Sequence, residues 1–325
     1  MTIQTHPFVS IVIPVFNEER YLSACLDSLV KIEYPIDSYE IIIVDNGSTD
    51  RSVEIASNYN VKIISKPKVK VGGVRNYGVK QSKGEIIVFL DSDCLVEPWW
   101  LSHGVELITK QGFDAVGGLF LLRENPAWIE KNWILRSSRE YVYQKTFIGA
   151  CIFIKRQAFE SLGGFNESLS AGEDCYLTEQ LKENNYNIQV IPKLGVIHLG
   201  YPTTIAGFMR RQIWHSSDYI NKLNHLLSDK TMFLVLLYIS TIILLAGSIL
   251  LKAKLTFIFL VILFLMAQPL LLTIKRINRY GNIKETSGFL SIYLVDILYI
   301  NARAFGFMKG LARRLMNKKD AKVAK

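Results

Sequence analysis

Apolar and polar positions alternate between two kinds of segment over the first ninety residues. Four short runs rich in branched apolar residues predict buried strands: FVSIVIPV (8–15), YEIIIVD (39–45), VKIISK (61–66) and EIIVFLD (85–91). The segments between them carry apolar residues at helical spacing, as in LSACLDSL (22–29), and predict helices. Strands separated by helices predict an α/β fold with a mostly parallel central sheet covered by helices.

The next hundred residues are less regular. FDAVGGLFLL (113–122) and FIGACIFIKR (147–156) predict two further strands, and NPAWIEKNWILRSSREYVYQ (125–144) predicts a helix. A helix over 171–185 would begin with Glu173 and Asp174, where the helix dipole favours negative charge. Residues 203–223 place apolar side chains at helical spacing among basic ones, which fits an amphipathic helix on a membrane surface or a plain connecting helix equally well.

Two long uncharged runs follow, at about 232–251 and 255–274. At about 1.5 Å per residue, twenty residues of helix cross a bilayer, so the pair predicts a transmembrane hairpin rather than two core helices. A third apolar stretch, at about 288–308, contains Asp296, Asn301 and Arg303. It could span the membrane, lie in the interface or pack on the soluble part.

The basic residues favour the interfacial alternative. Cytoplasmic segments carry an excess of Lys and Arg, and two basic clusters flank the third stretch: Lys275, Arg276, Arg279 and Lys284 before it, and Lys309, Arg313, Arg314, Lys318, Lys319, Lys322 and Lys325 after it. A two-span hairpin keeps both clusters on one side, although it leaves Lys252 and Lys254 of the turn outside. The start of the chain has no secretory signal pattern. We therefore predict a cytoplasmic domain over 1–225 and a membrane region over 226–325, in a multi-pass protein of the cell membrane.

Composition narrows the function classes. The 325 residues are 50% hydrophobic with a mean hydropathy of +0.20, and the length suits two domains. The net charge of +9 suits anionic lipid headgroups and phosphorylated substrates, and no nucleic-acid-binding motif accompanies it. The four cysteines lack disulfide or metal-type spacing, so we expect free thiols.

The candidate chemistry lies where the predicted strands end, because ligands of such sheets bind at the carboxyl ends of the strands. Asn17 and Glu18 follow the first strand, Asp45 ends the second, and Asp91 and Asp93 follow the fourth. No glycine-rich dinucleotide fingerprint or P-loop is present. An acidic sheet edge needs a divalent cation before it can hold a diphosphate.

Five motifs in order complete the picture: VSIVIPVFNEERYLSACLDSL, EIIIVDNGSTDRS, GGVRNYGVKQSKGEIIVFLDSDC, GACIFIKRQAFESLGGFNE and GEDCYLTEQL. Together they resemble family 2 of the inverting nucleotide-sugar glycosyltransferases, which have the GT-A fold, over about residues 8–215. The later RRQIW (210–214) resembles only loosely the Q-x-x-R-W element of processive members.

The resemblance implies roles for the matching residues. Pro14 and Glu18 would line the nucleotide pocket, and Asp45 would contact the base or ribose. Arg75 would lie near the nucleotide and its phosphates.

The acidic motifs would carry the reaction itself. Asp91 and Asp93 form the D-x-D element, in which Asp93 would bind Mn²⁺ or Mg²⁺ and Asp91 would contact ribose or a metal-bound water. Asp174 matches the general base of the E-D motif, with Glu173 beside it to share or replace that role.

We thus expect a metal-dependent inverting transfer from a nucleoside-diphosphate sugar, with UDP-sugar the default, to a hydroxyl of a lipid-linked or cell-surface glycan acceptor. A divalent ion would stabilise the leaving diphosphate and a carboxylate would take the acceptor proton. A polyprenyl-phosphate glycosyltransferase is the main alternative, and a phosphate acceptor would need the base less. A processive synthase and an inactive nucleotide-binding scaffold are further alternatives.

Overall fold

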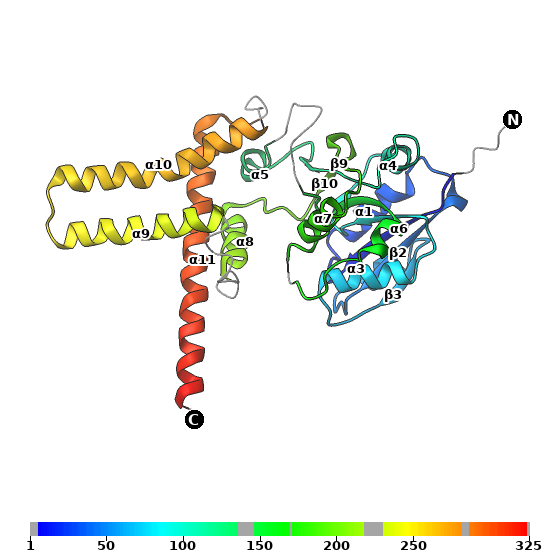
Figure 1. Cartoon of the computed structure of the whole chain (residues 1–325), viewed down its shortest axis with the longest axis horizontal. Helices are drawn as coiled ribbons and strands as arrows, with labels where there is room; N and C mark the ends of the chain where they lie inside the picture. Colours follow the sequence, from blue (N-terminus) through cyan, green and yellow to red (C-terminus); the bar gives the residue numbers. More distant parts are fainter. Residues whose placement is uncertain (1–5, 136–145, 170, 218–229, 281–285, 324–325) are drawn as a thin grey trace. The chain divides into compact units, whose positions relative to one another are not determined.

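The chain divides into two compact units, seen here in a computed structural model. The structure describes residues 6–135, 146–169, 171–217, 230–280 and 286–323. One unit comprises residues 1–123 and 139–200, and the other comprises 124–138 and 201–325. We call them the sheet unit and the helical unit and describe each by itself (Figure 1).

A seven-stranded sheet forms the centre of the sheet unit, in the order β3-β2-β1-β4-β8-β6-β9. Its strands are β1 (Val9–Val15), β2 (Tyr39–Asp45), β3 (Lys62–Ser65), β4 (Ile86–Leu90), β6 (Ala115–Gly117), β8 (Cys151–Lys155) and β9 (Ile188–Val190). The pairs among β3, β2, β1 and β4 are parallel, as is β6 with β9, whereas β8 runs antiparallel to β4 and β6. The predicted mostly parallel sheet is confirmed.

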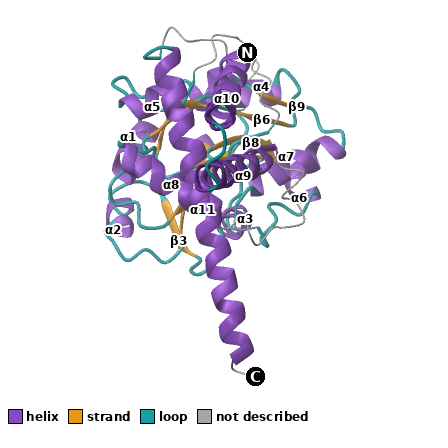
Figure 2. Ribbon diagram, turned by 90° about the vertical axis from the view of Figure 1, so that its left-hand side faces the viewer, coloured by secondary structure: helices purple, strands orange, loops and turns teal. Residues whose placement is uncertain are grey.

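Helices cover both faces of this sheet (Figure 2). They are α1 (Leu22–Val30), α2 (Ser52–Ala56), α3 (Val71–Lys80), α4 (Trp100–Thr109), α6 (Arg156–Ser161) and α7 (Glu173–Glu183), with short 3₁₀ turns at Ile36–Ser38 and Pro192–Leu194. Side chains alternate across a strand, so Ile11 and Ile13 of β1 pack in one core cluster with α1 and α4. Val12, between them, packs in the other with α3, α6 and α7.

A second, three-stranded sheet lies beside the carboxyl end of β4. It consists of β5 (Cys94–Leu95), β7 (Phe120–Leu121) and β10 (Val196–His198), in the order β5-β10-β7. Because β10 pairs antiparallel with β5, His198 lies opposite Cys94. This pairing joins positions about a hundred residues apart, and the sequence pattern did not predict it.

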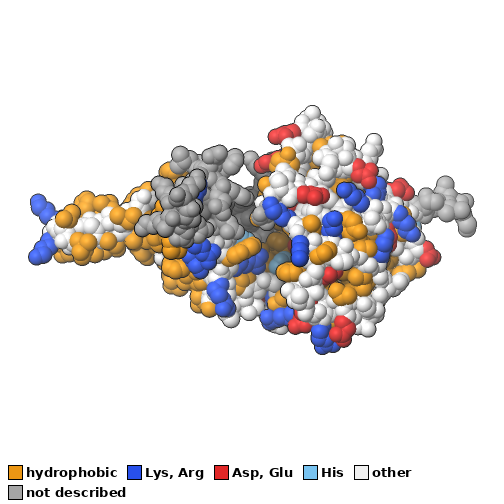
Figure 3. All heavy atoms as spheres, turned by 90° about the horizontal axis from the view of Figure 1, so that it is seen from below, with side chains coloured by type: hydrophobic (Ala, Val, Ile, Leu, Met, Phe, Trp, Pro, Cys, Tyr) orange, Lys and Arg blue, Asp and Glu red, His pale blue; other side chains and the backbone are white. Residues whose placement is uncertain are grey.

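The helical unit contains α5 (Trp128–Trp133), α8 (Ile205–Ser217), α9 (Lys230–Leu250), α10 (Leu255–Tyr280) and α11 (Phe289–Val323). Three of its helices are long and apolar enough to cross a membrane, by length and composition: 230–250, 255–278 and 289–316. The two predicted spans are thus α9 and α10, joined by a short turn at the far end of the hairpin (Figure 1). Apolar side chains dominate the surface of this hairpin, and basic ones mark its tip (Figure 3).

The third stretch differs from the first two, as its polar residues predicted. The span within α11 has a mean hydropathy of 1.3, against 2.5 and 2.6 for α9 and α10, and 44% of it is buried against 22% for each of the others. Its Asp296 is fully buried and pairs with Arg276 of α10, while Thr273 donates a hydrogen bond of 2.8 Å to the same carboxylate. A buried charge needs such partners.

Two helix predictions need correction or qualification. The helix predicted over 125–144 begins at Trp128 and ends at Trp133 instead, and residues 136–144 of that prediction lie outside the described residues. The sequence places Ile205, Phe208, Met209 and Ile213 on the apolar face of α8, and of these only Phe208 is buried, while Ile205 is 49% exposed. Residues 218–223 of that helix, and Lys284 and Lys325 of the basic clusters, also lie outside the described residues. The division into two compact units does not test which residues lie in the membrane. The boundary between residues 225 and 226 therefore stays a prediction.

Candidate functional site

The carboxyl ends of three neighbouring parallel strands bring the predicted site residues together. β2, β1 and β4 are adjacent in the sheet, and their ends lead into Asp45, the 16–19 turn and Asp91. Parallel strands place their carboxyl ends at one sheet edge, where such folds bind ligands. Pro14 lies one residue before the end of β1, half-buried and paired with Val44.

Backbone amides hold the Asp45 carboxylate. It accepts hydrogen bonds of 3.0 Å from the N–H groups of Gly47 and Ser48, and the side chain is 7% exposed. The next residues tie this loop to the first one, because Asn17 accepts a hydrogen bond from Thr49 N–H at 2.8 Å. Asp45 therefore shapes the loop at the sheet edge, as a turn residue does, and its predicted contact with base or ribose stays a prediction.

Arg75 joins three elements through a buried ion-pair network. Its side chain is 3% exposed, and its two terminal nitrogens each donate a 2.7 Å hydrogen bond, one to Asp91 after β4 and one to Glu173 at the start of α7. Burial alone would lower the pKa of Arg75, but Asp91 and Glu173 outweigh it and the pKa is raised. A side chain on Gly149 would approach the guanidinium to 2.7 Å, so this glycine leaves the room that Arg75 occupies.

Asp174, unlike Glu173, is not bound to Arg75. One of its carboxylate oxygens accepts the N–H of Gly149 at 2.9 Å, and the other accepts the N–H of Cys175 at 2.7 Å. Those two amides fix the direction of the carboxylate. The adjacent acidic residues thus have different surroundings: Glu173 belongs to a buried ion pair, whereas the Asp174 carboxylate accepts two backbone N–H groups and lies beside the Cys175 thiol.

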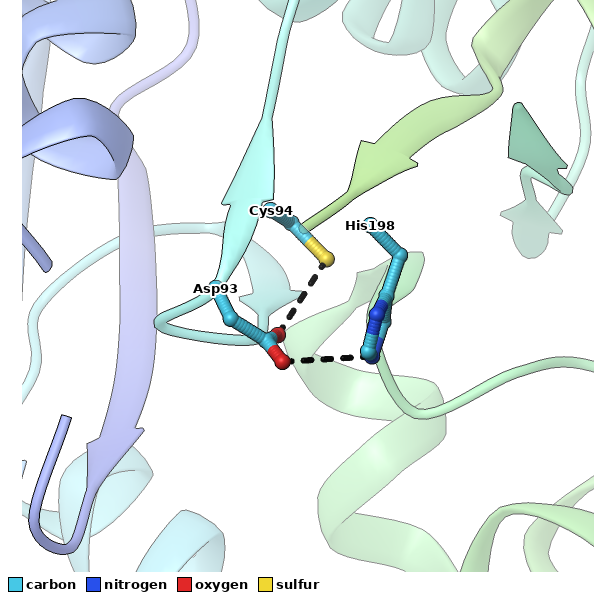
Figure 4. A group of neighbouring side chains, drawn as sticks. All are labelled: Asp93, Cys94 and His198. Carbon is cyan, nitrogen blue, oxygen red and sulfur yellow. Dashed lines mark hydrogen bonds and ion pairs between the residues drawn. The ribbon is translucent and has the colours of Figure 1, made fainter. Parts of the chain in front are cut away.

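The Asp93 side chain lies next to His198, which is about a hundred residues further along the chain. His198 Nε2 lies 3.3 Å from Asp93 Oδ2, and the Cys94 thiol donates to Asp93 Oδ1 at 3.8 Å (Figure 4). The pairing of β10 with β5 creates this contact, and Leu199 N–H reinforces it with a 2.7 Å hydrogen bond to the Asp93 carbonyl oxygen. A Cβ added to Gly200 would lie 2.1 Å from Asp93 Oδ2, so a larger residue there would displace the Asp93 carboxylate.

These three side chains are the group of possible metal ligands among the described residues, with donor atoms within 4.8 Å of one another. Burial, followed by the charges of Asp91 and Asp93, raises the pKa of the Cys94 thiol well above its usual value, which makes it the weakest of the three donors in the metal-free protein. The carboxylate of Asp93 and the imidazole of His198 remain. A carboxylate with one imidazole fits a divalent transition ion better than an all-oxygen cation such as Ca²⁺.

The raised pKa of Glu18 reflects the concentration of negative charge at this edge of the sheet. Its pKa is raised to about 7 by burial first and then by Asp93, Asp91 and Asp50. Like charges that close disfavour ionisation of one another. Negative charge is therefore concentrated at this edge of the sheet, in spite of the ion pair between Arg75 and Asp91.

The predicted residues thus form two groups within one unit. Arg75, Asp91 and Glu173 form the ion-pair network, and Asp93 lies with His198. The sequence shows no metal-type spacing around His198 and so gives this histidine no assigned role, although its position allows it to flank the active site. One feature of the sequence points to His198. It ends a short apolar strand, as other polar site residues do, and Gly200 follows two residues later. All four cysteines are free thiols, as predicted, with Cys175 exposed and the others buried.

Comparison of the chain with known proteins shows which family it resembles. Residues 10–163 match the profile of glycosyl transferase family 2. Glycosyltransferase AglE of Haloferax volcanii is 31% identical over 195 residues, which are 57% of this chain and 64% of the relative. Beta-monoglucosyldiacylglycerol synthase of Nostoc sp. is 29% identical over 241 residues, 67% of this chain and 50% of the relative. The chain thus spans between half and just under two thirds of the length of these curated relatives.

A solved structure supports the fold. The mannosyltransferase PcManGT from Pyrobaculum calidifontis, in complex with GDP-Man and Mn²⁺, superposes with a TM-score of 0.60 at 18% identity, covering 94% of this chain and 88% of that one. The resemblance predicted from the five motifs is confirmed, and so is the fold class. The chain contains a family 2 glycosyltransferase domain with the GT-A fold, followed by three apolar helices that could span a membrane.

Proposed function

We propose that this protein is a membrane-anchored, metal-dependent inverting glycosyltransferase that moves a sugar from a nucleoside-diphosphate sugar to an acceptor hydroxyl. The observation that carries the proposal is the pair of differently held carboxylates at one sheet edge. Asp93 lies against an imidazole in a metal-ligand pair, whereas Asp174 is held by two amides. Asp93 would bind a cation on the diphosphate of the donor, and Asp174 would act as the base.

In this proposal the ion-pair network sets the geometry of the donor site. Asp93 and His198 would hold a divalent ion, which when bound stabilises the negative charge of the leaving diphosphate. The imidazole favours Mn²⁺ over Mg²⁺, since Mg²⁺ prefers oxygen ligands. Arg75 keeps Asp91 and Glu173 in place, and Pro14, Glu18 and Asp45 would line the nucleotide side.

Asp174 would take the proton of the attacking acceptor hydroxyl. Its two amide contacts fix the carboxylate, and a base fixed in direction can receive a proton without reorganising. Glu173 is the weaker candidate for base, because Arg75 already engages it. Attack from the face opposite the leaving diphosphate inverts the anomeric carbon and needs no protein nucleophile.

The relatives and the apolar helices support a nucleotide-sugar donor and a lipid acceptor. Solved structures of similar fold contain GDP-Man with Mn²⁺ or UDP, and one relative is named for a glucosylated diacylglycerol product. With α9 and α10 in a bilayer, an acceptor linked to lipid would share the membrane. The basic clusters favour a cytoplasmic orientation of the domain in the cell membrane.

Release of nucleoside diphosphate tests the proposal. Purified full-length protein would be incubated with UDP-, GDP- and dTDP-sugars, Mn²⁺ or Mg²⁺, and a membrane lipid extract. We expect release with at least one donor, and we expect Asp93→Ala and His198→Ala each to raise the Mn²⁺ concentration needed. Absence of release with every donor would refute the transferase activity. Full activity in the presence of a chelator would refute the role of the metal.

A further inference from the structure

A small cavity lies between the three apolar helices of the helical unit. It has a volume of about 220 Å³, and its walls come from the beginning of α9, the carboxyl half of α10 and the middle of α11. Phe233, Leu234, Leu271 and Ile300 contribute apolar surface. The cavity is smaller than the roughly 300–1,000 Å³ of typical small-molecule pockets, so it has room for part of a long apolar chain.

Two lysines from different helices line the same cavity. Lys230 is the first residue of α9, directly before the uncharged run 232–251, and Lys275 directly follows the uncharged run 255–274 of α10. The helices form a hairpin whose turn contains Lys252 and Lys254 at the opposite end (Figure 1). Lys230 and Lys275 therefore mark one and the same boundary between apolar and polar surface.

Neither lysine is neutralised within the part of the chain that the structure describes. No ion pair is found for Lys230 or Lys275 there, whereas the neighbouring Arg276 pairs with Asp296 and donates to the carbonyl oxygens of Asn132 and Trp133. Two cations that line an apolar cavity match, in charge and polarity, a phosphate that carries an acyl chain. Basic pockets between membrane helices recognise anionic headgroups for this reason.

Much of the apolar surface around this cavity is not covered by protein. Only 22% of the candidate span in α9, and the same share in α10, is covered by the protein, and Phe233 and Leu271 at the cavity are 55% and 63% exposed. In contrast, Tyr299, which also lines the cavity, is 9% exposed and stacks on Trp133 with ring centroids 5.0 Å apart. A lipid chain that enters past Phe233 and Leu271 could thus contact a side chain that is already held in place.

We propose that this cavity binds an anionic phospholipid of the membrane, with its phosphate between Lys230 and Lys275 and the upper part of one acyl chain against Phe233, Leu234 and Leu271. The inference rests on α9 and α10 lying in a bilayer and not on sugar transfer. The bound lipid would fill the gap between three helices and hold α9 against α10 and α11. Its readout is lipid binding, so its failure is distinct from failure of the transferase proposal.

Native mass spectrometry of the full-length protein in a neutral detergent tests this, with phosphatidylglycerol and phosphatidylcholine titrated separately. We expect one phosphatidylglycerol to bind more tightly than phosphatidylcholine, and Lys230→Gln with Lys275→Gln to weaken it about tenfold or more. The matched control is Lys252→Gln with Lys254→Gln, which removes the same charge from the other end of the same hairpin and should leave this binding unchanged. Equal losses in both double variants would mean unspecific attraction and overturn the proposal.

Two further arms separate a pocket from a charged surface. Leu271→Trp fills the side entrance without changing charge, and we expect it to weaken phosphatidylglycerol binding as well. Inorganic phosphate in excess should not displace the lipid, because the acyl chain supplies part of the affinity. Unchanged binding in a folded Leu271→Trp variant, or displacement by phosphate alone, would contradict an apolar cavity and leave only the two lysines as a surface phosphate site.

Discussion

Neighbouring acidic residues in this site differ in what they can do because their partners differ. Glu173 is 7% exposed and bound to Arg75, and losing one member of a buried ion pair leaves an uncompensated charge. Asp174 accepts two amide N–H groups that an asparagine could partly satisfy. We therefore expect Glu173 to serve mainly the fold and Asp174 to serve the proposed reaction.

Asp174→Asn should abolish most sugar transfer while leaving nucleotide binding intact. A positioned base contributes roughly 10²–10⁴-fold, so a loss of that order is expected. Glu173→Gln is the control, and it should lower the melting temperature more than Asp174→Asn does. Initial rates and donor-induced melting shifts would measure both, and a variant Asp174→Asn within tenfold of the parent rate would exclude the base role.

Glu18 predicts a pH dependence for the metal-free protein. Its pKa is raised to about 7 from an ordinary 4.5, so the folded state binds its proton more tightly than the unfolded state. The contribution of Glu18 to stability is fully present below pH 4.5 and is lost as the pH rises through about 7. Melting in the presence of a chelator should show this part of the stability falling between pH 5 and 8. Glu18→Gln should flatten the profile over that interval, and an unchanged slope would show that other groups cause it.

Two glycines of α11 allow it to pack closely against α8. On α11, a Cβ added to Gly306 would approach the Ile213 carbonyl oxygen of α8 to 2.4 Å, and one added to Gly310 would approach that of Ser217 to 2.2 Å. Backbone atoms cannot move aside as a flexible side chain can. The predicted amphipathic helix is thus held by α11 along one face, while Arg210 and Trp214 stay exposed on the other.

Gly306→Leu should separate α8 from α11 and destabilise the helical unit by about 1–3 kcal/mol, the usual cost of overpacking. Gly247→Leu in α9 is the matched control, because nothing lies within 4 Å of an added Cβ there. Limited proteolysis in detergent would compare the two variants at the 201–217 segment. Equal protection of that segment in both would mean that the α8–α11 contact contributes little.

The molecule as a whole combines an acidic sheet edge with a basic, apolar carboxyl-terminal part. The net charge of +9 is therefore not spread evenly, and its Lys and Arg clusters flank helices that could cross a membrane. From this distribution we expect the basic segments to lie on the cytoplasmic side. The same charges favour an interfacial α11 over a third crossing.

Cysteine labelling would decide the topology. In a background carrying Cys175→Ser, we expect Ala253→Cys in the hairpin turn to react with an impermeant maleimide in intact cells. Met316→Cys near the end of α11 should react only after permeabilisation, because an interfacial α11 keeps the basic tail inside. Labelling of Met316→Cys in intact cells would instead show a third crossing, and labelling of neither would place the turn inside.

The sequence by itself determined the elements and the family. Branched apolar runs identified β1, β2 and β4, the uncharged runs identified α9 and α10, and five motifs identified the glycosyltransferase domain. These features are local, or depend on order along the chain. The tertiary structure decided which residues meet: His198 with Asp93 through the β5–β10 pair, Arg75 with both Asp91 and Glu173, and two lysines at one cavity. Those contacts join positions from 16 to about a hundred residues apart, and no local periodicity encodes such pairings, since they follow from how sheets and helices pack.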